Sequence, residues 1–230
     1  MSDRFYFDGP LGPGDVTLEG PEAHHLTAVR RFAAGDAVTL FNGDGHEYPA
    51  LVVDAGKRRA TVRVTAIRSP DRELGFPLHV ASALPKGDRG NFLIEKLTEL
   101  GATDFTPLVS ERSVVKADDA KADKLRRAVI EASKQCGRNV LMRVHPPARW
   151  LDWCERQSGL RLIAHPGNAA RGFAPVPGGA TIAIGPEGGF SDAEVRAALG
   201  AGWDRLSLGP RVLRVETAAL AAAVLFGRSL

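Results

Sequence analysis

From residue 78 onward the chain repeats one local pattern: an apolar run of strand length, a turn, and the start of a helix. The clearest copies are IAIGPEGGFSDAEV at residues 182–195 and LSLGPRVLRVETAALAAAVLF at residues 206–226. The pattern predicts strands at 78–84, 105–111, 160–164, 181–185 and 205–209, and helices at 86–100, 118–136, 191–200 and 215–227. Such alternation indicates a parallel sheet with helices on both faces, which binds ligands beyond the carboxyl ends of its strands.

The first 70 residues have a different pattern, in which short β-like runs alternate with turn signals. These runs predict strands at residues 4–7, 16–19, 37–42, 48–53 and 60–67. The sequence Asn-Gly-Asp-Gly at residues 42–45 predicts a hairpin turn, and a helix is predicted from Pro21 to Phe32. We therefore expect a small β-barrel domain at residues 1–70, a linker-like segment at 69–77, and an α/β domain at 71–230.

Composition narrows the class of protein. The net charge is +3 and the pI about 9.1, a mild bias toward acidic partners such as nucleic acid. Cys136 and Cys154 form no CxxC pair, so neither a disulfide framework nor a metal site is indicated. The N-terminus has no apolar signal core, and the longest apolar run, 218–226, is about half of the roughly 20 residues that a membrane span needs. We expect a soluble, cytoplasmic protein.

The first glycine turn, Gly185-Pro186-Glu187-Gly188-Gly189, does not match the known phosphate-binding loops. A P-loop requires a lysine after its glycines, and none follows here. The spacing of a dinucleotide-binding GxGxxG motif is also absent, and Glu187 adds a negative charge where a phosphate would lie. The turn is either a non-phosphate ligand site or simply a tight connection that needs glycine for its backbone geometry.

The second turn carries two arginines, Arg211 and Arg214, followed by Glu216. Two cations beside a glycine turn at the carboxyl edge of a sheet favour a functional site over a solvated surface. An ordinary helix cap that includes Arg214 and Glu216 is the alternative.

These two turns are part of a longer series of motifs. Five motifs follow one another along the chain in the order HHLTAVRRFAAGD (24–36), LPKGDRGNFLIEKLTELGATDFTPLVSERSVVK (84–116), EASKQCGRN (131–139), GPEGG and LGPRVLRVETAALAA. In these five motifs the chain resembles the ribosomal RNA uracil-N3 methyltransferases of the RsmE type, within the SPOUT class. Arg30 is a departure, because the family more often has leucine there.

The resemblance implies a SPOUT-type parallel sheet with a deep trefoil knot, a PUA-like N-terminal domain that holds RNA, and a homodimer. It also implies S-adenosylmethionine as cofactor and N3 of one uridine in 16S ribosomal RNA, free or in the small subunit, as the methylated atom. A different RNA target, or a non-catalytic RNA-binding module, is the alternative. A nucleotide hydrolase is disfavoured because the P-loop lysine is missing.

The ends of three predicted strands supply the expected cofactor site. Its residues are Ile163, Ala164, His165, Ile184, Gly185, Glu187, Gly188, Gly189, Leu208, Gly209, Val212 and Leu213. For catalysis, Arg211 and Arg214 are expected to hold the uracil oxygens or the RNA backbone, and Glu216 is a candidate base.

RNA affinity should depend on contacts between cationic side chains and phosphates. The candidates are Arg4, Arg30, Arg31, Lys86, Arg89, Arg112 and Arg138, with Lys57, Arg58 and Arg59 as a second group that is equally consistent with a solvated hairpin end. His24 and His25 are adjacent on a helix and point about 100° apart, so a shared metal is not expected.

Overall fold

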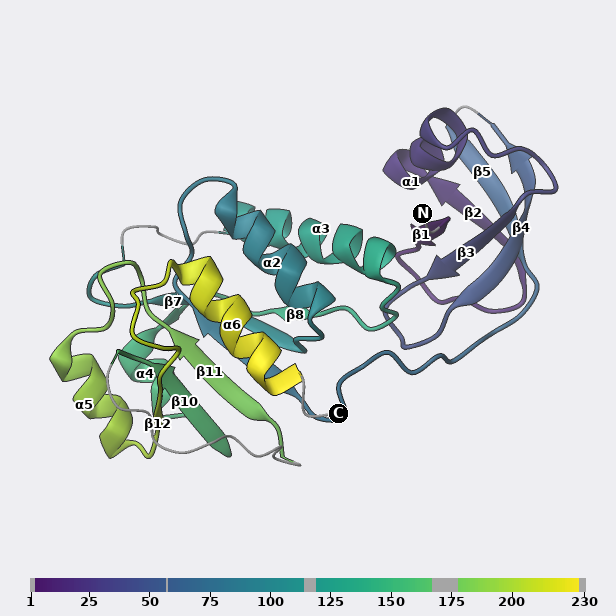
Figure 1. Cartoon of the computed structure of the whole chain (residues 1–230). Coiled ribbons are helices and arrows are strands. Elements are labelled where there is room, and N and C mark those ends of the chain that lie inside the picture. The colour runs from purple at the N-terminus through teal and green to yellow at the C-terminus, as the bar shows by residue number, and fades with distance from the viewer. Residues whose placement is uncertain (1–2, 57, 114–118, 167–177, 228–230) are drawn as a thin grey trace. The chain divides into compact units, whose positions relative to one another are not determined.

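A computed structural model describes residues 3–56, 58–113, 119–166 and 178–227 (Figure 1). The chain forms two compact units. The first comprises Met1–Glu73 and Ile130–Leu141, and the second comprises Leu74–Val129 and Met142–Leu230. The main segment of the first unit ends close to the boundary expected at residue 70. Residues 130–141, however, pack with the first unit although the sequence placed them in the second domain.

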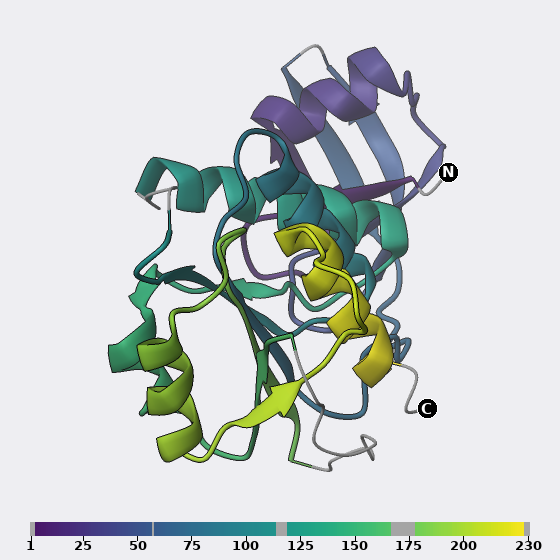
Figure 2. The ribbon, with the colours of Figure 1, turned by 60° about the vertical axis from the view of Figure 1, so that its left-hand side comes forward.

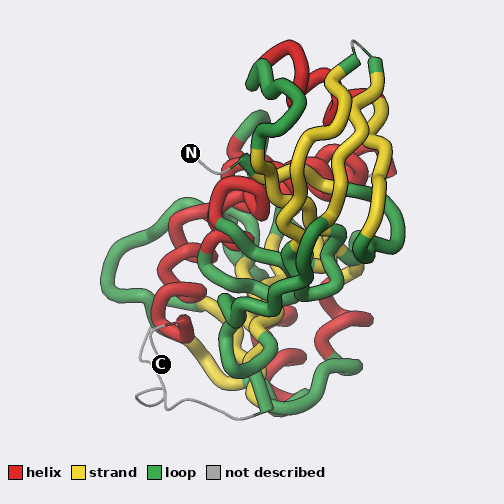
Figure 3. The backbone as a smooth tube through the Cα atoms, turned by 90° about the vertical axis from the view of Figure 1, so that its right-hand side faces the viewer, coloured by secondary structure: helices red, strands yellow, loops and turns green. Residues whose placement is uncertain are grey.

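The first unit contains one curled five-stranded sheet (Figure 3). Its strands are β1 (Arg4–Tyr6), β2 (Gly14–Glu19), β3 (Ala37–Phe41), β4 (Tyr48–Ala55) and β5 (Arg59–Val64). The strand order is β1-β3-β4-β5-β2, with β1 parallel to β3 and the other neighbours antiparallel. All five predicted strands are present, and inward-facing side chains such as Phe5, Leu40 and Val62 form a buried core.

The helix predicted at residues 21–32 is shorter and less regular than expected. It consists of α1 (Gly20–His24) and a π-helical turn, η1 (His25–Val29). The wider turn appears in the bond from Arg30 N to His25 O, 2.9 Å, which spans five residues. Arg31 then has a φ of 59°, a left-handed conformation that ends the helix and is uncommon for a residue other than glycine.

The second unit is built on a seven-stranded parallel sheet (Figures 1 and 2). The strands are β6 (Leu78–Ser82), β7 (Asp104–Val109), β8 (Arg143–Val144), β9 (Ala148–Arg149), β10 (Leu160–Ala164), β11 (Ala180–Ile184) and β12 (Asp204–Leu206). The order is β12-β10-β11-β6-β7-β8, and β9 also pairs with β7. The five predicted strands are confirmed, whereas β8 and β9 are too short for a sequence pattern.

The helices of the second unit are α2 (Arg89–Glu99), α3 (Asp119–Cys136), whose last residues belong to the first unit, α4 (Trp150–Cys154), α5 (Asp192–Gly200) and α6 (Val215–Gly227). α2 packs on α6, which covers β6 and β11. α4 and α5 pack together on the other face, where Trp150, Trp203 and Phe190 form a buried cluster with Ala183 of β11. Both faces of the sheet are therefore covered, as the alternation of strands and helices predicts.

At the amino end of this sheet, His79 and Asp104 form a polar cluster. The carboxylate of Asp104 accepts a hydrogen bond from Arg143 Nε at 2.8 Å, and its Oδ1 lies 2.7 Å from His145 Nε2. Burial raises the pKa of Asp104, but these hydrogen bonds outweigh it and set that pKa to about 2. Burial lowers the pKa of His79 to about 4, and its ring lies 5.4 Å from that of Trp153.

This cluster predicts that the second unit loses stability in mild acid. Between the ordinary pKa of histidine, about 6.5, and the folded value of about 4, the unfolded chain binds a proton at His79 that the folded chain does not. We expect the free energy of unfolding to fall by about 3 kcal/mol across that window. Asp104 adds to the loss only below pH 3.8. Urea unfolding followed by tryptophan fluorescence at several pH values tests this, and the same slope in His79→Gln would refute it.

Candidate functional site

The two glycine turns and the end of β10 enclose one pocket of about 350 Å³ in the second unit. Eleven of the twelve residues expected at a cofactor site line it. They are Ala164, His165, Ile184, Gly185, Glu187, Gly188, Gly189, Leu208, Gly209, Val212 and Leu213. The pocket lies beyond the carboxyl ends of β10, β11 and β12, where a parallel sheet of this kind binds its ligand.

Ile163 is the exception. It is fully buried in the cluster around the tryptophans, because alternate residues of a strand face opposite sides of the sheet. The pocket also includes Arg112, which was predicted to contact RNA, and residues that sequence reasoning did not select: Pro166, Pro186, Phe190, Asp192, Leu206, Val215 and Ala218. Pro186, Phe190 and Asp192 belong to the first turn or directly follow it, so their position beside the glycines was an available signal. Arg112 lies far away in the sequence, and its motif predicted a contact with RNA rather than a place in the cofactor site.

The first turn is tightly folded. Gly189 has a φ of 68°, and its N–H donates to Pro186 O at 2.7 Å. A Cβ at Gly185 would lie 3.0 Å from the Phe190 ring and 3.1 Å from the Phe190 backbone nitrogen. Glycine is therefore required there by close packing and at Gly189 by backbone conformation.

The helix that follows this turn begins with a capping box. Ser191 is the N-cap, its side chain accepts from Glu194 N, and the Glu194 carboxylate accepts from Ser191 N at 2.8 Å. Glu194 is only 4% exposed. The sequence Ser-Asp-Ala-Glu thus fixes the direction in which the chain leaves the pocket.

In the second turn, Gly209 has a φ of 102° and the chain then enters α6. Arg211 lines the pocket, and Arg214 stands just before the helix, where its carbonyl accepts from Ala218 N at 2.9 Å. Both arginine side chains are exposed. Arg211 thus contributes a cation to the lining, whereas Arg214 stands between two lining residues, Leu213 and Val215, without lining the pocket itself.

Glu216 lies in a different environment from the two arginines. It is 7% exposed and does not line the pocket. Its Oε1 lies 3.4 Å from Arg89 Nη1 of α2, and its Oε2 is buried with no hydrogen-bond partner among the described residues. A second, weaker contact of 3.9 Å joins Arg89 to Glu187 in the first turn. Arg89 thus connects the acidic residues of both turns.

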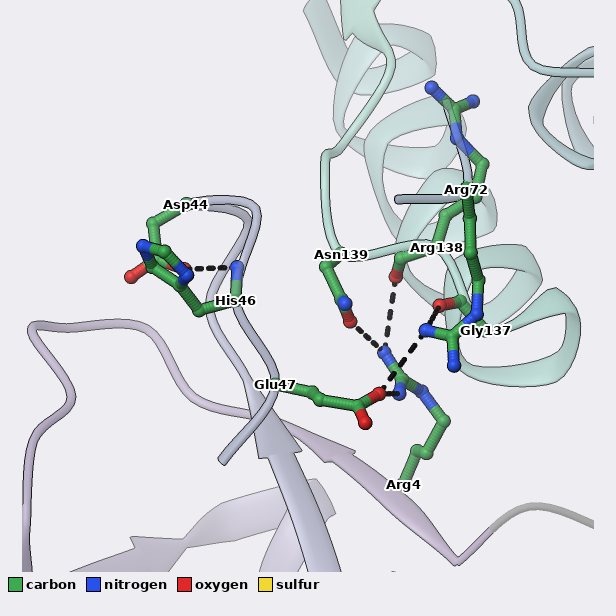
Figure 4. Close-up of polar contacts among 8 residues, drawn as sticks. All are labelled: Arg4, Asp44, His46, Glu47, Arg72, Gly137, Arg138 and Asn139. Carbon is green, nitrogen blue, oxygen red and sulfur yellow. Dashed lines mark hydrogen bonds and ion pairs between the residues drawn. The ribbon is translucent and has the colours of Figure 1, made fainter. Parts of the chain in front are cut away.

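The predicted RNA contacts divide into buried and exposed residues. Arg4 and Arg138, of the first unit, are 6% and 3% exposed. Arg4 donates to Glu47 Oε2 at 3.1 Å and to Arg138 O at 3.2 Å (Figure 4). Arg138 Nε donates to Glu73 Oε1 at 3.0 Å. Burial and pairing of both guanidinium groups argue against phosphate contacts by these two residues.

The other candidates lie at the surface or in the walls of the pocket. Arg30 pairs with Asp3 and lies over the Phe32 ring, whereas Arg31 and Lys86 are exposed. Arg112 Nη1 donates to Gly188 O at 2.8 Å. In the second group, Arg59 pairs with Glu19 at 2.9 Å, Arg58 is exposed, and Lys57 lies outside the described residues.

Two further observations concern the described residues as a whole. None of their helices has both the length and the apolar character needed to cross a membrane. Among the same residues, histidine, cysteine, aspartate and glutamate side chains form no group of three suited to a metal ion. His25 instead packs against Phe5, with ring centroids 5.6 Å apart.

Comparison with known proteins agrees with this architecture. Residues 72–227 match the model of an RNA methyltransferase domain, and residues 18–65 match that of an RNA methyltransferase PUA domain. The chain is 34% identical over 222 residues to ribosomal RNA small subunit methyltransferase E of Bacillus subtilis, an alignment that covers 90% of this chain and 87% of the relative.

Solved structures agree as well. The methyltransferase E of Neisseria gonorrhoeae, determined with S-adenosyl methionine bound, is 31% identical with a TM-score of 0.90, and the match covers 97% of this chain and 96% of that one. A protein from Legionella pneumophila, determined with the bound cofactor SAM, is 35% identical with a TM-score of 0.92 and coverages of 98% and 97%. The chain therefore belongs to the ribosomal RNA small subunit methyltransferase E family.

Proposed function

We propose that the protein transfers a methyl group from S-adenosylmethionine to N3 of one uridine in 16S ribosomal RNA. The observation that carries this proposal is the single pocket that the GPEGG and LGPRVLR turns form together. Both turns belong to the motifs by which the chain resembles the uracil-N3 methyltransferases, and relatives of the same family are named for small-subunit ribosomal RNA.

The residues that line the pocket fit S-adenosylmethionine. A volume of about 350 Å³ is in the range of small-molecule sites, and apolar side chains such as Ile184 and Leu208 alternate with glycine backbone. The lining includes the carboxylates of Glu187 and Asp192, the guanidinium groups of Arg112 and Arg211 and no lysine, so its formal charges balance. In a cofactor that carries a sulfonium, an amino group and a carboxylate the charges balance only in part, and the two carboxylates of the pocket can face its positively charged end. When bound, the cofactor supplies a methyl group on a positively charged sulfur.

Methylation at N3 requires the loss of the imide proton of uracil. Arg211 and Arg214 can stabilise the negative charge that then develops on the base. Electrostatic stabilisation of this kind is usually the largest single contribution to an enzyme's rate enhancement. The two turns would hold the base in line with the methyl group, so that much of the remaining rate enhancement comes from positioning. Glu216 stays a prediction for the proton acceptor, and its supporting feature is a buried Oε2 that has no hydrogen-bond partner in the described part of the chain.

For the RNA contacts we propose Arg31 and Lys86 as the leading residues, because both side chains are exposed. Arg31 is held in a left-handed conformation, and strain of this kind is concentrated at functional sites. The uridine itself must leave its stack to reach a pocket of this kind. Such a substrate assigns the protein to the cytoplasm.

The function is tested by incubating the protein with labelled S-adenosylmethionine and small ribosomal subunits that lack the modification, followed by mapping of the labelled nucleotide. Naked 16S RNA in a parallel reaction identifies the preferred form of the substrate. Label on N3 of a single uridine supports the proposal. Label on a ribose or another base would refute the assignment to N3, and cofactor binding without transfer to any RNA would favour a binding module.

We also propose that the protein is a homodimer, as its resemblance to the family implies. Phe92 on α2 and Val224 and Leu225 on α6, two helices that pack together, are 44%, 40% and 46% exposed and offer apolar surface to a second copy of the chain. Sedimentation equilibrium should give twice the mass of 24.5 kDa calculated for one chain. A single-chain mass at micromolar concentration would contradict this proposal.

A further inference from the structure

The turn at residues 110–113, with the sequence Ser-Glu-Arg-Ser, follows β7. Ser110 N donates to Ser113 Oγ at 2.9 Å, and Ser113 N donates to Ser110 O at 3.1 Å. These two bonds close the turn on itself. They constrain the backbone at Glu111 and Arg112, the two exposed residues at its centre.

Both central residues bond to the segment that contains the first glycine turn. Glu111 N donates to Glu194 Oε1 at 2.8 Å, while Glu194 Oε2 accepts from Ser191 N at 2.8 Å. Arg112 Nη1 donates to Gly188 O at 2.8 Å. The same carboxylate thus caps α5 and holds the Ser110–Ser113 turn, and a charged donor holds the peptide carbonyl in the middle of the GPEGG sequence.

The aliphatic part of the Arg112 side chain also lies close to Gly188. A Cβ built on Gly188 would lie 3.4 Å from Arg112 Cδ and 3.5 Å from Arg112 Cβ. Arg112 also lines the pocket itself. Its guanidinium is therefore in the wall of the pocket and is hydrogen-bonded to that wall.

We infer that Arg112 is a positioning residue of the cofactor site, which orients the Gly188 peptide before S-adenosylmethionine binds. This inference rests on the proposed function and replaces the phosphate contact predicted for Arg112 from its motif. A hydrogen bond from a charged group to a backbone carbonyl is stronger than a neutral one, so the turn is organised in advance at no further cost in conformational entropy.

The inference is tested by calorimetric titration of S-adenosylmethionine into the wild type, Arg112→Met and Arg112→Lys. The matched control is Arg196→Met, at an exposed arginine of α5 that does not line the pocket. We expect Arg112→Met to raise the Kd about 10-fold, the fold-change that follows from loss of one hydrogen bond made by an exposed charged side chain. Lysine retains one donor and should recover part of the affinity, and the control should match the wild type.

Two measurements without cofactor separate this role from phosphate binding. Hydrogen exchange of the amides at residues 187–191 should be faster in Arg112→Met than in Arg196→Met. Binding of a 16S RNA fragment at several salt concentrations should be the same in both variants. An unchanged cofactor Kd with a smaller salt slope for RNA would overturn the inference. A wild type that binds no S-adenosylmethionine would overturn the proposed function as well, whereas equal Kd values for wild type and Arg112→Met would overturn the inference alone.

Discussion

Arg214→Ala should lower kcat about 100- to 1,000-fold, the usual effect of removing a fixed donor that stabilises charge developing in the transition state. The Kd for S-adenosylmethionine should stay within about 2-fold of the wild type, because Arg214 lies outside the lining of the pocket. Its carbonyl, which accepts the first bond of α6, is retained in the variant, so the helix should persist. Single-turnover methylation and calorimetry measure the two quantities separately.

Arg211→Ala provides a comparison within the same turn. Arg211 lines the pocket, so its loss should weaken cofactor binding as well as turnover. Arg205→Ala is the control, because Arg205 is an exposed arginine of β12 that does not line the pocket. An Arg214→Ala enzyme with the rate of Arg205→Ala would remove Arg214 from the catalytic site.

The core of the α/β unit was predictable because its strands are continuous apolar runs. Residues 180–184 of β11 are buried on both faces, and only a strand covered by helices on both sides needs such a sequence. The positions of the two glycine turns followed from those strands, since the carboxyl ends of parallel strands meet at one edge. Most of the pocket lining therefore lies in segments that local patterns indicate, whereas Arg112 reaches it from a distant turn.

Side-chain partners were less predictable, because a charged residue looks the same in a sequence whether it faces water or a carboxylate. Arg4 and Arg138 are 134 residues apart and meet only in the folded chain. Nothing in their local sequence indicates Glu47 or Glu73 as partners. The assignment of residues 130–141 to the first unit depends on the same long-range contacts. The trefoil knot, which rests on family resemblance, stays a prediction.

Those contacts lead to a prediction of large effect on stability. Arg4→Met should lower the free energy of unfolding of the first unit by about 3 kcal/mol. Arg4 is 6% exposed, and burial lowers its pKa while Glu47 opposes that shift. Without the Arg4 guanidinium, Glu47 keeps one ion-pair partner among the described residues, Arg72 at 3.1 Å. The Arg138 carbonyl and Asn139 Oδ1 each lose a hydrogen-bond donor. Most of the loss in stability comes from these buried acceptors, because each loses the donor that Arg4 supplies.

The distribution of aromatic residues makes this effect easy to assign to one unit. All three tryptophans, Trp150, Trp153 and Trp203, belong to the second unit. The unfolding transition that their fluorescence reports should therefore be the same in Arg4→Met as in the wild type. Hydrogen exchange should accelerate in residues 3–73 and, because Arg4 bonds to Arg138 and Asn139, in residues 130–141 as well. Arg63→Met is the control, since Arg63 pairs with Asp15 on the exposed side of β5 and its loss should change stability little. If residues 130–141 stayed protected in Arg4→Met while residues 3–73 opened, the Arg4 contacts would not be what holds that segment in the first unit.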